Sequence, residues 1–178
     1  MTSHRVVLAL GSNLGDRLAN LQAGLDVLCG APGLSCSAVS PVYETVPVGG
    51  PQQPDFLNAV VIATTGLSAR SVLDRCQAAE AALHRVRGEI WGPRTLDVDI
   101  IVYDAAISAD PELTLPHPRA HERAFVLAPW HDIEPDALIP GHGATADLLA
   151  AGGGSGVRPL QGTRLRIPGG SGQQAAQG

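Results

Sequence analysis

The chain has 178 residues, a formal net charge of −5 and 44% hydrophobic residues. This length is sufficient for one hydrophobic core, and a nucleic-acid-binding protein would more often be basic overall. The first residues lack the pattern of a signal peptide, and no apolar run approaches the roughly 20 residues of a membrane-spanning helix. Composition therefore predicts a single-domain, cytoplasmic protein with neither nucleic-acid nor membrane partners.

Two regions of different composition divide the chain. We expect residues 1–150 to form the single domain, and residues 151–178 to be a Gly-rich C-terminal extension that is largely disordered. Within the extension, Val157 to Ile167 could add a short edge strand or stay irregular. We assign no chemistry to it.

The first predicted elements are a strand and a helix. Arg5 to Leu10 is typical of a buried strand, and leucines recur at helical spacing from residue 18 until Gly30 ends the helix. The connecting loop, Gly11 to Asp16, lacks the Lys and the spacing of a phosphate-binding loop. We interpret it as a tight turn in which Asp16 or Asn13 caps the helix.

The remaining elements complete a recognisable order. Leu34 to Tyr43 and Phe56 to Thr64 are typical of strands, and a helix follows from Ser68 to about His84. A strand containing Asp97 and Asp99 comes next. Strand, helix, strand, strand, helix, strand is the order of an α+β ferredoxin-like sandwich, an antiparallel sheet with helices on one face. The other face would remain open for ligands.

The three cysteines are odd in number and lie among apolar neighbours. They also lack the spacing of metal ligands. We therefore expect Cys29, Cys36 and Cys76 to be buried free thiols.

The segment Trp91 to Ile100 places two carboxylates directly after a Trp/Pro/Arg turn. If the apolar residues that alternate with them point into the core, Asp97 and Asp99 stand side by side on the opposite face. Like charges that close repel unless cations lie on them, and Mg²⁺ takes one or two carboxylates together with substrate phosphates. The pair predicts a metal–phosphate site, with a solvated strand face as the alternative.

All twelve basic residues are arginines, and several surround the two aspartates. The guanidinium group is a planar fork of donors that suits phosphate oxygens. A local basic cluster in an acidic protein favours a polyanion the size of a nucleotide. The members of this cluster are Arg85, Arg87, Arg94, Arg119 and Arg123.

Four separated motifs stand out along the chain. They are Gly11 to Gly15, Tyr43 to Thr45 with Gln53 to Asn58, Trp91 to Asp99, and Leu115 to Arg119 with Glu122 to Phe125. Together they resemble the 6-hydroxymethyl-7,8-dihydropterin pyrophosphokinase family of folate biosynthesis. Their order and spacing match over roughly Val6 to Pro140, and the combination is far more specific than any single short motif.

This resemblance implies the ferredoxin-like architecture, with residues 1–150 as the catalytic domain, and a reaction. ATP would donate a pyrophosphoryl group to the hydroxymethyl oxygen of the dihydropterin, giving AMP and the pterin diphosphate. Two Mg²⁺ ions held by Asp97 and Asp99 would bridge the phosphates. The substrates would be small molecules only, and we expect a monomer.

The resemblance also implies a role for each matching residue. Two aromatic faces suit a flat pterin, and an amide can pair with its polar edge. The implied pterin residues are Thr45, Val48, Phe56, Asn58, Trp91 and Phe125. The implied ATP residues are Gln77, Glu80, Arg87, Trp91, Ile100, His117 and Arg123, and the catalytic residues are Arg85, Arg94, Asp97 and Asp99. We expect Gln77 and Glu80 on a helix face away from Cys76.

Further expectations concern loops and alternative functions. The segments Val46 to Pro54 and Gly88 to Pro93 could close over ATP.

Two other functions remain open. A metal-dependent glycosyltransferase also uses an Asp-x-Asp pair, although this chain is short for one. A nucleotide-binding module without catalysis is the third possibility.

Overall fold

The computed structural model describes residues 2–47, 52–83, 95–152 and 156–169. Its main sheet has the strand order β10-β3-β4-β1-β5, with β2 also paired to β4, and every pairing in it is antiparallel. The elements up to β5 are β1 (His4–Ser12), α1 (Arg17–Gly30), β2 (Leu34–Val39), β3 (Tyr43–Thr45), β4 (Phe56–Thr65), α2 (Ala69–Ala82) and β5 (Asp97–Tyr103). The later elements are β6 (Ser108–Asp110), β7 (Leu113–Leu115), the 3₁₀ helix η1 (Ala120–Glu122), α3 (Ala124–Ile133), β8 (Leu138–Ile139), β9 (Gly143–Ala144), α4 (Thr145–Gly152) and β10 (Val157–Pro159).

The ferredoxin-like arrangement predicted from the element order is confirmed. The region expected as one strand, Leu34 to Tyr43, is divided between β2 and β3, which pair with opposite ends of β4. The division falls at Ser40, whose side chain and backbone both bond to Val60 of β4, and at Pro41, which has no N–H to donate. Strand order and direction otherwise agree with the sandwich.

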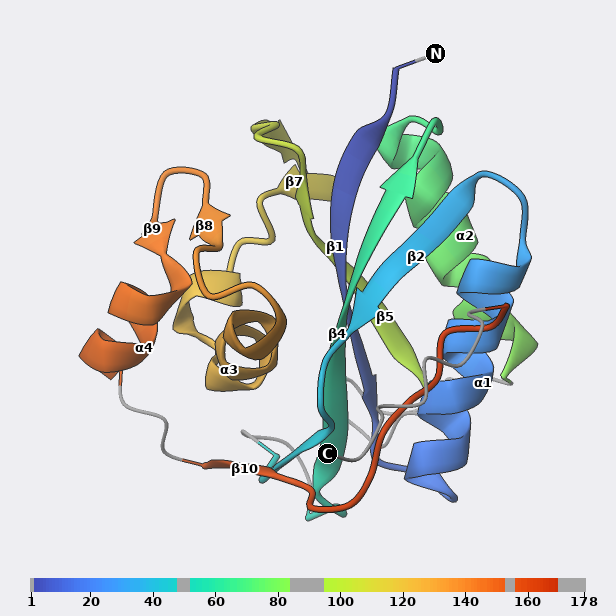
Figure 1. Cartoon of the computed structure of the whole chain (residues 1–178), viewed down its shortest axis with the longest axis vertical. Helices are drawn as coiled ribbons and strands as arrows, with labels where there is room; N and C mark the ends of the chain where they lie inside the picture. The colour runs from blue at the N-terminus through green and yellow to red at the C-terminus, as the bar shows by residue number, and fades with distance from the viewer. Residues whose placement is uncertain (1, 48–51, 84–94, 153–155, 170–178) are drawn as a thin grey trace, which may run out of the picture.

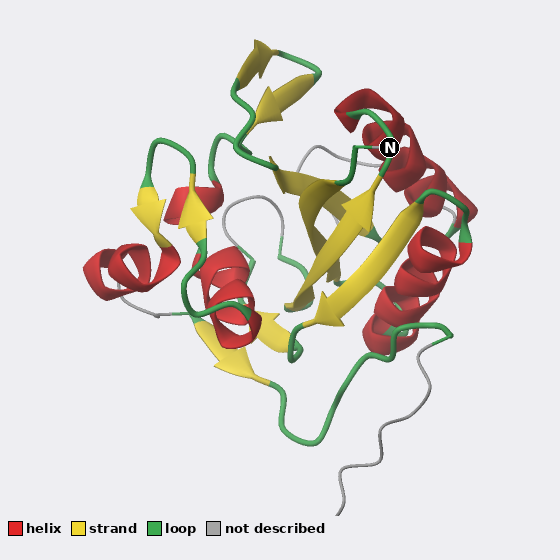
Figure 2. Cartoon of the chain, turned by 45° about the horizontal axis from the view of Figure 1, so that its top comes forward, coloured by secondary structure: helices red, strands yellow, loops and turns green. Residues whose placement is uncertain are grey.

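Helices α1 and α2 cover one face of the sheet (Figure 1; Figure 2). Leucines of α1 and apolar residues of α2 pack there against alternate residues of β1, β4 and β5. Each helix begins at the residue expected to cap it, because Asp16 accepts a bond from the Ala19 N–H and Ser68 from the Ser71 N–H.

Helix α3 packs on part of the opposite face, on the other side of the sheet from α1 and α2 (Figure 1). Trp130 of α3 is fully buried in a second core with Val7, Val60 and Ile101. The face expected to be open for ligands is therefore open only beyond the area that α3 covers.

Close packing between α1 and the segment before β5 sets the position of that strand. A Cβ atom at Gly24 would lie 2.7 Å from a terminal carbon of Leu96, which is fully buried. Any side chain at position 24 would force the Leu96 side chain to shift, so the glycine allows this close approach of the helix. Leu96 is thereby anchored directly before Asp97, the first residue of β5.

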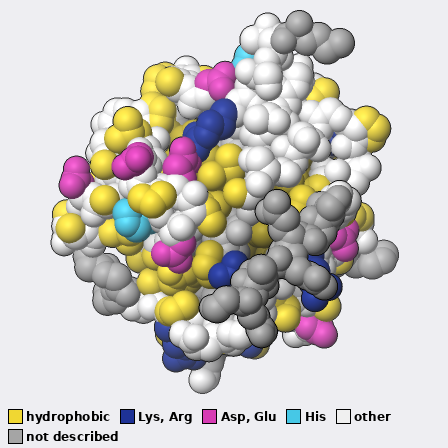
Figure 3. Space-filling view, viewed as in Figure 1, with side chains coloured by type: hydrophobic (Ala, Val, Ile, Leu, Met, Phe, Trp, Pro, Cys, Tyr) yellow, Lys and Arg dark blue, Asp and Glu magenta, His cyan; other side chains and the backbone are white. Residues whose placement is uncertain are grey.

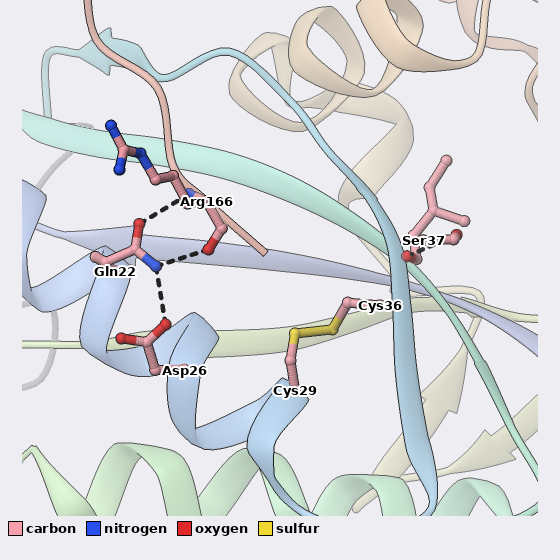
Figure 4. Close-up of a disulfide and its surroundings, with 7 residues drawn as sticks. Gln22, Asp26, Cys29, Cys36, Ser37 and Arg166 are labelled. Atoms are coloured by element: carbon pink, nitrogen blue, oxygen red, sulfur yellow. Dashed lines mark hydrogen bonds between the residues drawn. A yellow bond between two sulfur atoms is a disulfide. The ribbon is translucent and has the colours of Figure 1, made fainter. Parts of the chain in front are cut away.

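The expectation of three free thiols is wrong for two of them. Cys29, in the last turn of α1, forms a disulfide with Cys36 of β2 (Figure 4). The turn at Gly33, which has a positive φ, returns the chain beside the helix, so the two Cα atoms lie 5.7 Å apart. Cys76 is buried and free, as predicted, and burial raises its pKa to about 12.

The expectation of a largely disordered extension does not hold for residues 156–169. Strand β10 pairs with β3, which is the edge-strand alternative left open by the sequence, and Leu165 is buried in the core beneath α1. The side chain of Gln22 on α1 bonds to both the backbone N–H and the carbonyl of Arg166 (Figure 4). This stretch is folded against the domain.

Candidate active site

A row of directly paired residues crosses three strands on the face opposite α1 and α2. Gly11 of β1 pairs with Asn58 of β4 on one side and with Asp97 of β5 on the other. Directly paired residues in an antiparallel sheet present their side chains to the same face. Since Gly11 has no side chain, no Cβ separates Asn58 from Asp97, and the Asn58 amide oxygen lies 3.1 Å from the place that a Cβ at Gly11 would take.

The two aspartates have the arrangement predicted for them. Residues 96, 98 and 100 are buried on the α1/α2 side, while Asp97 and Asp99 are partly exposed on the opposite side. Asp99 pairs with Ala9, so the side chain beside the second carboxylate is also small. Two carboxylates therefore share one accessible face of β5.

Basic side chains from the segment after β7 approach these carboxylates. His117 Nε2 lies 3.9 Å from Asp99 Oδ2. Burial lowers the pKa of Arg123, although attraction to Asp99 and, more weakly, Asp97 opposes that shift. Arg123 also lies 5.4 Å from the centroid of the Phe125 ring, within the range of a cation–π contact. The structure thus combines acidic and basic groups at one end of the sheet.

His117 is held in one orientation by the backbone. Its Nδ1 accepts a bond from the Arg119 N–H at 3.2 Å, so the neutral ring carries its proton on Nε2. Burial lowers the pKa of His117, and the attraction of Asp99, at 3.9 Å, is too distant to reverse this. A neutral His117 therefore directs an N–H donor toward the carboxylates.

This depressed pKa predicts a specific pH dependence of stability. The unfolded chain binds a proton at position 117 near the ordinary His pKa of about 6.5, while the folded protein resists it, so His117 destabilises the fold as pH falls through and below that value. Urea unfolding should show that the free energy of unfolding falls less between pH 8 and pH 5.5 for His117→Gln than for the wild type. Parallel pH profiles for the two proteins would contradict this assignment.

Polar and aromatic groups gather on the other side of Gly11. The Asn58 side-chain nitrogen donates to the Thr45 hydroxyl at 2.8 Å, and both residues are buried. Phe56 is half-buried. A Cβ at Gly11 would lie 3.1 Å from the Asn58 oxygen and 3.7 Å from the Phe56 ring, so both side chains lie beside Gly11. Phe125 is half-buried on α3. Thr45, Phe56 and Asn58 thus form one group of neighbouring side chains on the face that carries the carboxylates.

Comparison with known proteins identifies the family of the chain. The family model for 7,8-dihydro-6-hydroxymethylpterin-pyrophosphokinase (HPPK) matches residues 7–135. The chain belongs to the HPPK family. It is 49% identical over 160 residues to a Mycobacterium leprae 2-amino-4-hydroxy-6-hydroxymethyldihydropteridine pyrophosphokinase, with 83% of this chain and 82% of that protein covered. A Methylorubrum extorquens protein of the same name is 41% identical over 157 residues, covering 88% and 99%.

Solved structures with the HPPK name share the fold. A Plasmodium falciparum HPPK-DHPS variant with pteroate superposes with a TM-score of 0.66 at 15% identity, over 84% of this chain. A second HPPK-DHPS structure, in complex with substrates, has a TM-score of 0.66 at 12% identity. This chain spans 43% of each of those proteins, so the likeness concerns their HPPK-like fold.

Two residues that the HPPK resemblance assigns to ATP have buried side chains. Glu80 was expected on a helix face away from Cys76, but it is buried beside Cys76 on α2. Gln77 is exposed. Helical spacing in fact places residue 80 one turn after residue 76 and on the same face, so the expectation for Glu80 was wrong. Ile100 packs in the core beneath α1 and α2, so only its backbone could face a nucleotide.

The buried Glu80 side chain has a structural partner at the carboxylate pair. Its Oε1 accepts a bond at 2.9 Å from the backbone N–H of Val98, the residue between Asp97 and Asp99. β5 lies at the edge of the sheet formed by the described strands, so none of them pairs with this N–H on that side. Glu80 therefore fixes the backbone that carries both aspartates.

Removal of the Glu80 acceptor should destabilise the protein. Glu80→Ala leaves a buried N–H without its partner, and we expect a loss of about 1–3 kcal/mol in the free energy of unfolding. Glu80→Gln keeps an acceptor oxygen, so its free energy of unfolding should fall clearly less. Urea unfolding of the two variants makes the comparison, and equal losses would contradict the role of the bond to Val98.

Several predicted site residues lie outside the described residues. They are Val48, Arg85, Arg87, Trp91 and Arg94, and the two segments expected to close over ATP are also wholly or partly outside. Gly11, by contrast, was interpreted as part of a turn, but it lies within β1. Its pairing with both Asn58 and Asp97 requires knowledge of the strand register, although its place in an HPPK-like motif was a signal.

Proposed function

We propose that this chain catalyses the reaction of its family, transfer of a pyrophosphoryl group from ATP to 6-hydroxymethyl-7,8-dihydropterin. The hydroxymethyl oxygen would form a bond to the β-phosphorus while the bond from that phosphorus to the α,β-bridging oxygen breaks. AMP and the pterin diphosphate would be the products. The single observation that carries this proposal is the row Asn58–Gly11–Asp97, which places polar and aromatic side chains suited to a pterin beside a carboxylate pair, with only the glycine between them.

The donor set of this site fits Mg²⁺. Asp97 and Asp99 offer hard oxygen ligands on one face of β5. Among the described residues, no group of three or more His, Cys, Asp or Glu side chains forms a closed metal cage. Mg²⁺ keeps several waters and is bound by one or two carboxylates with substrate phosphates, so such an open pair suits it. Two bound Mg²⁺ ions would offset charge on the phosphates and lower the pKa of the attacking hydroxyl.

The protein side chains would then bind and orient the two substrates. His117 directs an N–H donor, and Arg123 a guanidinium, to the region where the phosphates of ATP would lie. Asn58 offers its remaining donor and acceptor capacity to the polar edge of the pterin. Phe56 and Phe125 would stack on the pterin ring, and Thr45 holds the Asn58 amide in place.

Charge and hydropathy of the described residues support small-molecule substrates. No helix there is long and apolar enough to cross a membrane. On the face seen in Figure 3, basic side chains are few and lie among acidic and hydrophobic ones, without a continuous basic surface in the coloured part. A cytoplasmic monomer that binds ATP and the pterin is the form we propose.

Detection of AMP tests the proposal against both alternatives. Protein, ATP, Mg²⁺ and 6-hydroxymethyl-7,8-dihydropterin should yield AMP in amounts equal to the pterin diphosphate. A glycosyltransferase would release no AMP under these conditions, and a binding module would leave ATP intact. Absence of AMP, with a protein shown to be folded, would overturn the proposed reaction.

A further inference from the structure

A cluster of three charged side chains joins the C-terminal segment to the start of α1. Glu44 of β3 accepts bonds from Arg17 Nη1 at 2.9 Å and from Arg158 Nε at 3.1 Å, and Arg158 Nη2 bonds to the same carboxylate. Only 14% of the Glu44 side chain is exposed. Hydrogen bonds from Arg158 and then Arg17 hold the pKa of this carboxyl below its usual range.

This Arg17–Glu44–Arg158 cluster lies directly behind the proposed pterin pocket. Successive residues of a strand point to opposite faces, so Glu44 lies on the α1 side while Thr45 faces the pocket. Glu44 pairs with Leu57, and Thr45 pairs with Phe56. The carboxylate thus holds β3 from the rear at the point where Thr45 bonds to Asn58.

The same two arginines also contact the residue just before Phe56. Arg17 Nη1 donates to the Asp55 carbonyl at 2.8 Å, and Arg158 Nη2 lies 3.7 Å from the Asp55 carboxylate. Glu44 and Asp55 precede the two pocket residues Thr45 and Phe56 in the chain. One cluster therefore fixes the backbone beside both of these pocket residues.

The C-terminal segment that carries Arg158 is itself anchored at several points. Val157 pairs with Thr45, and the Leu160 N–H donates to the Val42 carbonyl at 2.8 Å. Farther on, Leu165 is buried in the core, and Gln22 binds the Arg166 backbone (Figure 4). In Figure 1 this segment, coloured red, runs from β10 along the lower end of the sheet to the side of α1.

We propose that Glu44 and Arg158 are positioning residues for the pterin pocket, and that the C-terminal segment of residues 156–169 belongs to the substrate-binding architecture. This inference rests on the proposed function. Arg158 acts without touching a substrate. It holds Glu44 and Asp55, and through them it positions the pocket residues that follow, Thr45 and Phe56. Thr45 in turn holds Asn58. Loss of Arg158 loosens the side chains that select the pterin and leaves the carboxylates of β5 unaffected.

Steady-state kinetics of Arg158→Ala test this role. With ATP saturating, the KM for the pterin should rise roughly three- to fivefold, the loss appropriate to a largely exposed charge pair. The kcat and the KM for ATP should stay within about twofold of the wild type, because the β5 site is unchanged. Arg158→Lys should restore part of the pterin affinity, since it keeps the charge but not the two-pronged bond.

A matched control is available on α2. Arg70 is also an exposed arginine, and it pairs with Glu112 on the surface. Arg70→Ala removes a comparable ion pair away from the pocket and should leave both KM values unchanged. Glu44→Gln, which keeps the shape of the side chain, should reproduce the pterin-specific effect even if Arg158→Ala folds poorly.

Three outcomes would overturn the inference. They are equal increases in KM for both substrates, a pterin effect of the same size in Arg70→Ala, or a lower melting temperature in Arg158→Ala and Glu44→Gln with unchanged kinetics. These results require wild-type protein that forms AMP. Failure of the wild type to form AMP is a different result and would overturn the proposed function.

Discussion

Replacement of either β5 carboxylate should reduce turnover by several orders of magnitude. Asp97→Ala or Asp99→Ala removes an oxygen ligand from the proposed Mg²⁺ site. Metal stabilisation of the transferring group supplies several kcal/mol, and each step of about 1.4 kcal/mol is a factor of ten in rate. The rate of AMP formation at saturating Mg²⁺ and substrates measures the loss.

The fold of these variants should survive, since both side chains are partly exposed. Without Mg²⁺, removal of one carboxylate relieves repulsion from the other but also loses attraction to Arg123, so the melting temperature should change little. The additional stability that Mg²⁺ with an ATP analogue confers on the wild type should be lost. Asp136→Ala, at an exposed carboxylate outside the site, is the control. A variant that melts far lower but keeps wild-type turnover would show that the aspartates are structural.

Substitution of Asn58 should affect the pterin far more than ATP. Asn58→Ala removes the amide that bonds to Thr45 and leaves the polar edge of a bound pterin without its partner. The expected loss in pterin binding is about 1–3 kcal/mol, or roughly 5- to 150-fold. Calorimetric titration with each ligand separately gives the two affinities.

A control on the same strand separates pocket effects from strand effects. Thr64 is exposed near the other end of β4 and has the same parity along the strand as Asn58. Thr64→Ala should change neither affinity. Equal losses for pterin and ATP in Asn58→Ala would count against the pocket assignment, because a general loosening of the sheet would weaken both ligands.

Local patterns accounted for most of the fold. Leucine spacing and the caps Asp16 and Ser68 predicted α1 and α2, and both helices begin where these side chains bond to backbone N–H groups. These signals work because capping and amphipathic spacing act within a few residues. The division between β2 and β3 was missed, since it depends on Ser40 bonding to Val60, a residue distant in sequence.

The sequence by itself determined the family, the order of the strands and helices as far as β5 apart from the division of β2 from β3, and the side-by-side carboxylates of Asp97 and Asp99. Each follows from residue type and short-range periodicity, and the family from motifs whose order is read along the chain. Only the tertiary structure decided that Gly11 joins the two halves of the site, that Glu80 is buried at Val98, that Cys29 bonds to Cys36, and that Arg158 reaches Glu44. These four depend on strand register and on contacts between different helices and strands, which the pattern within one element does not specify.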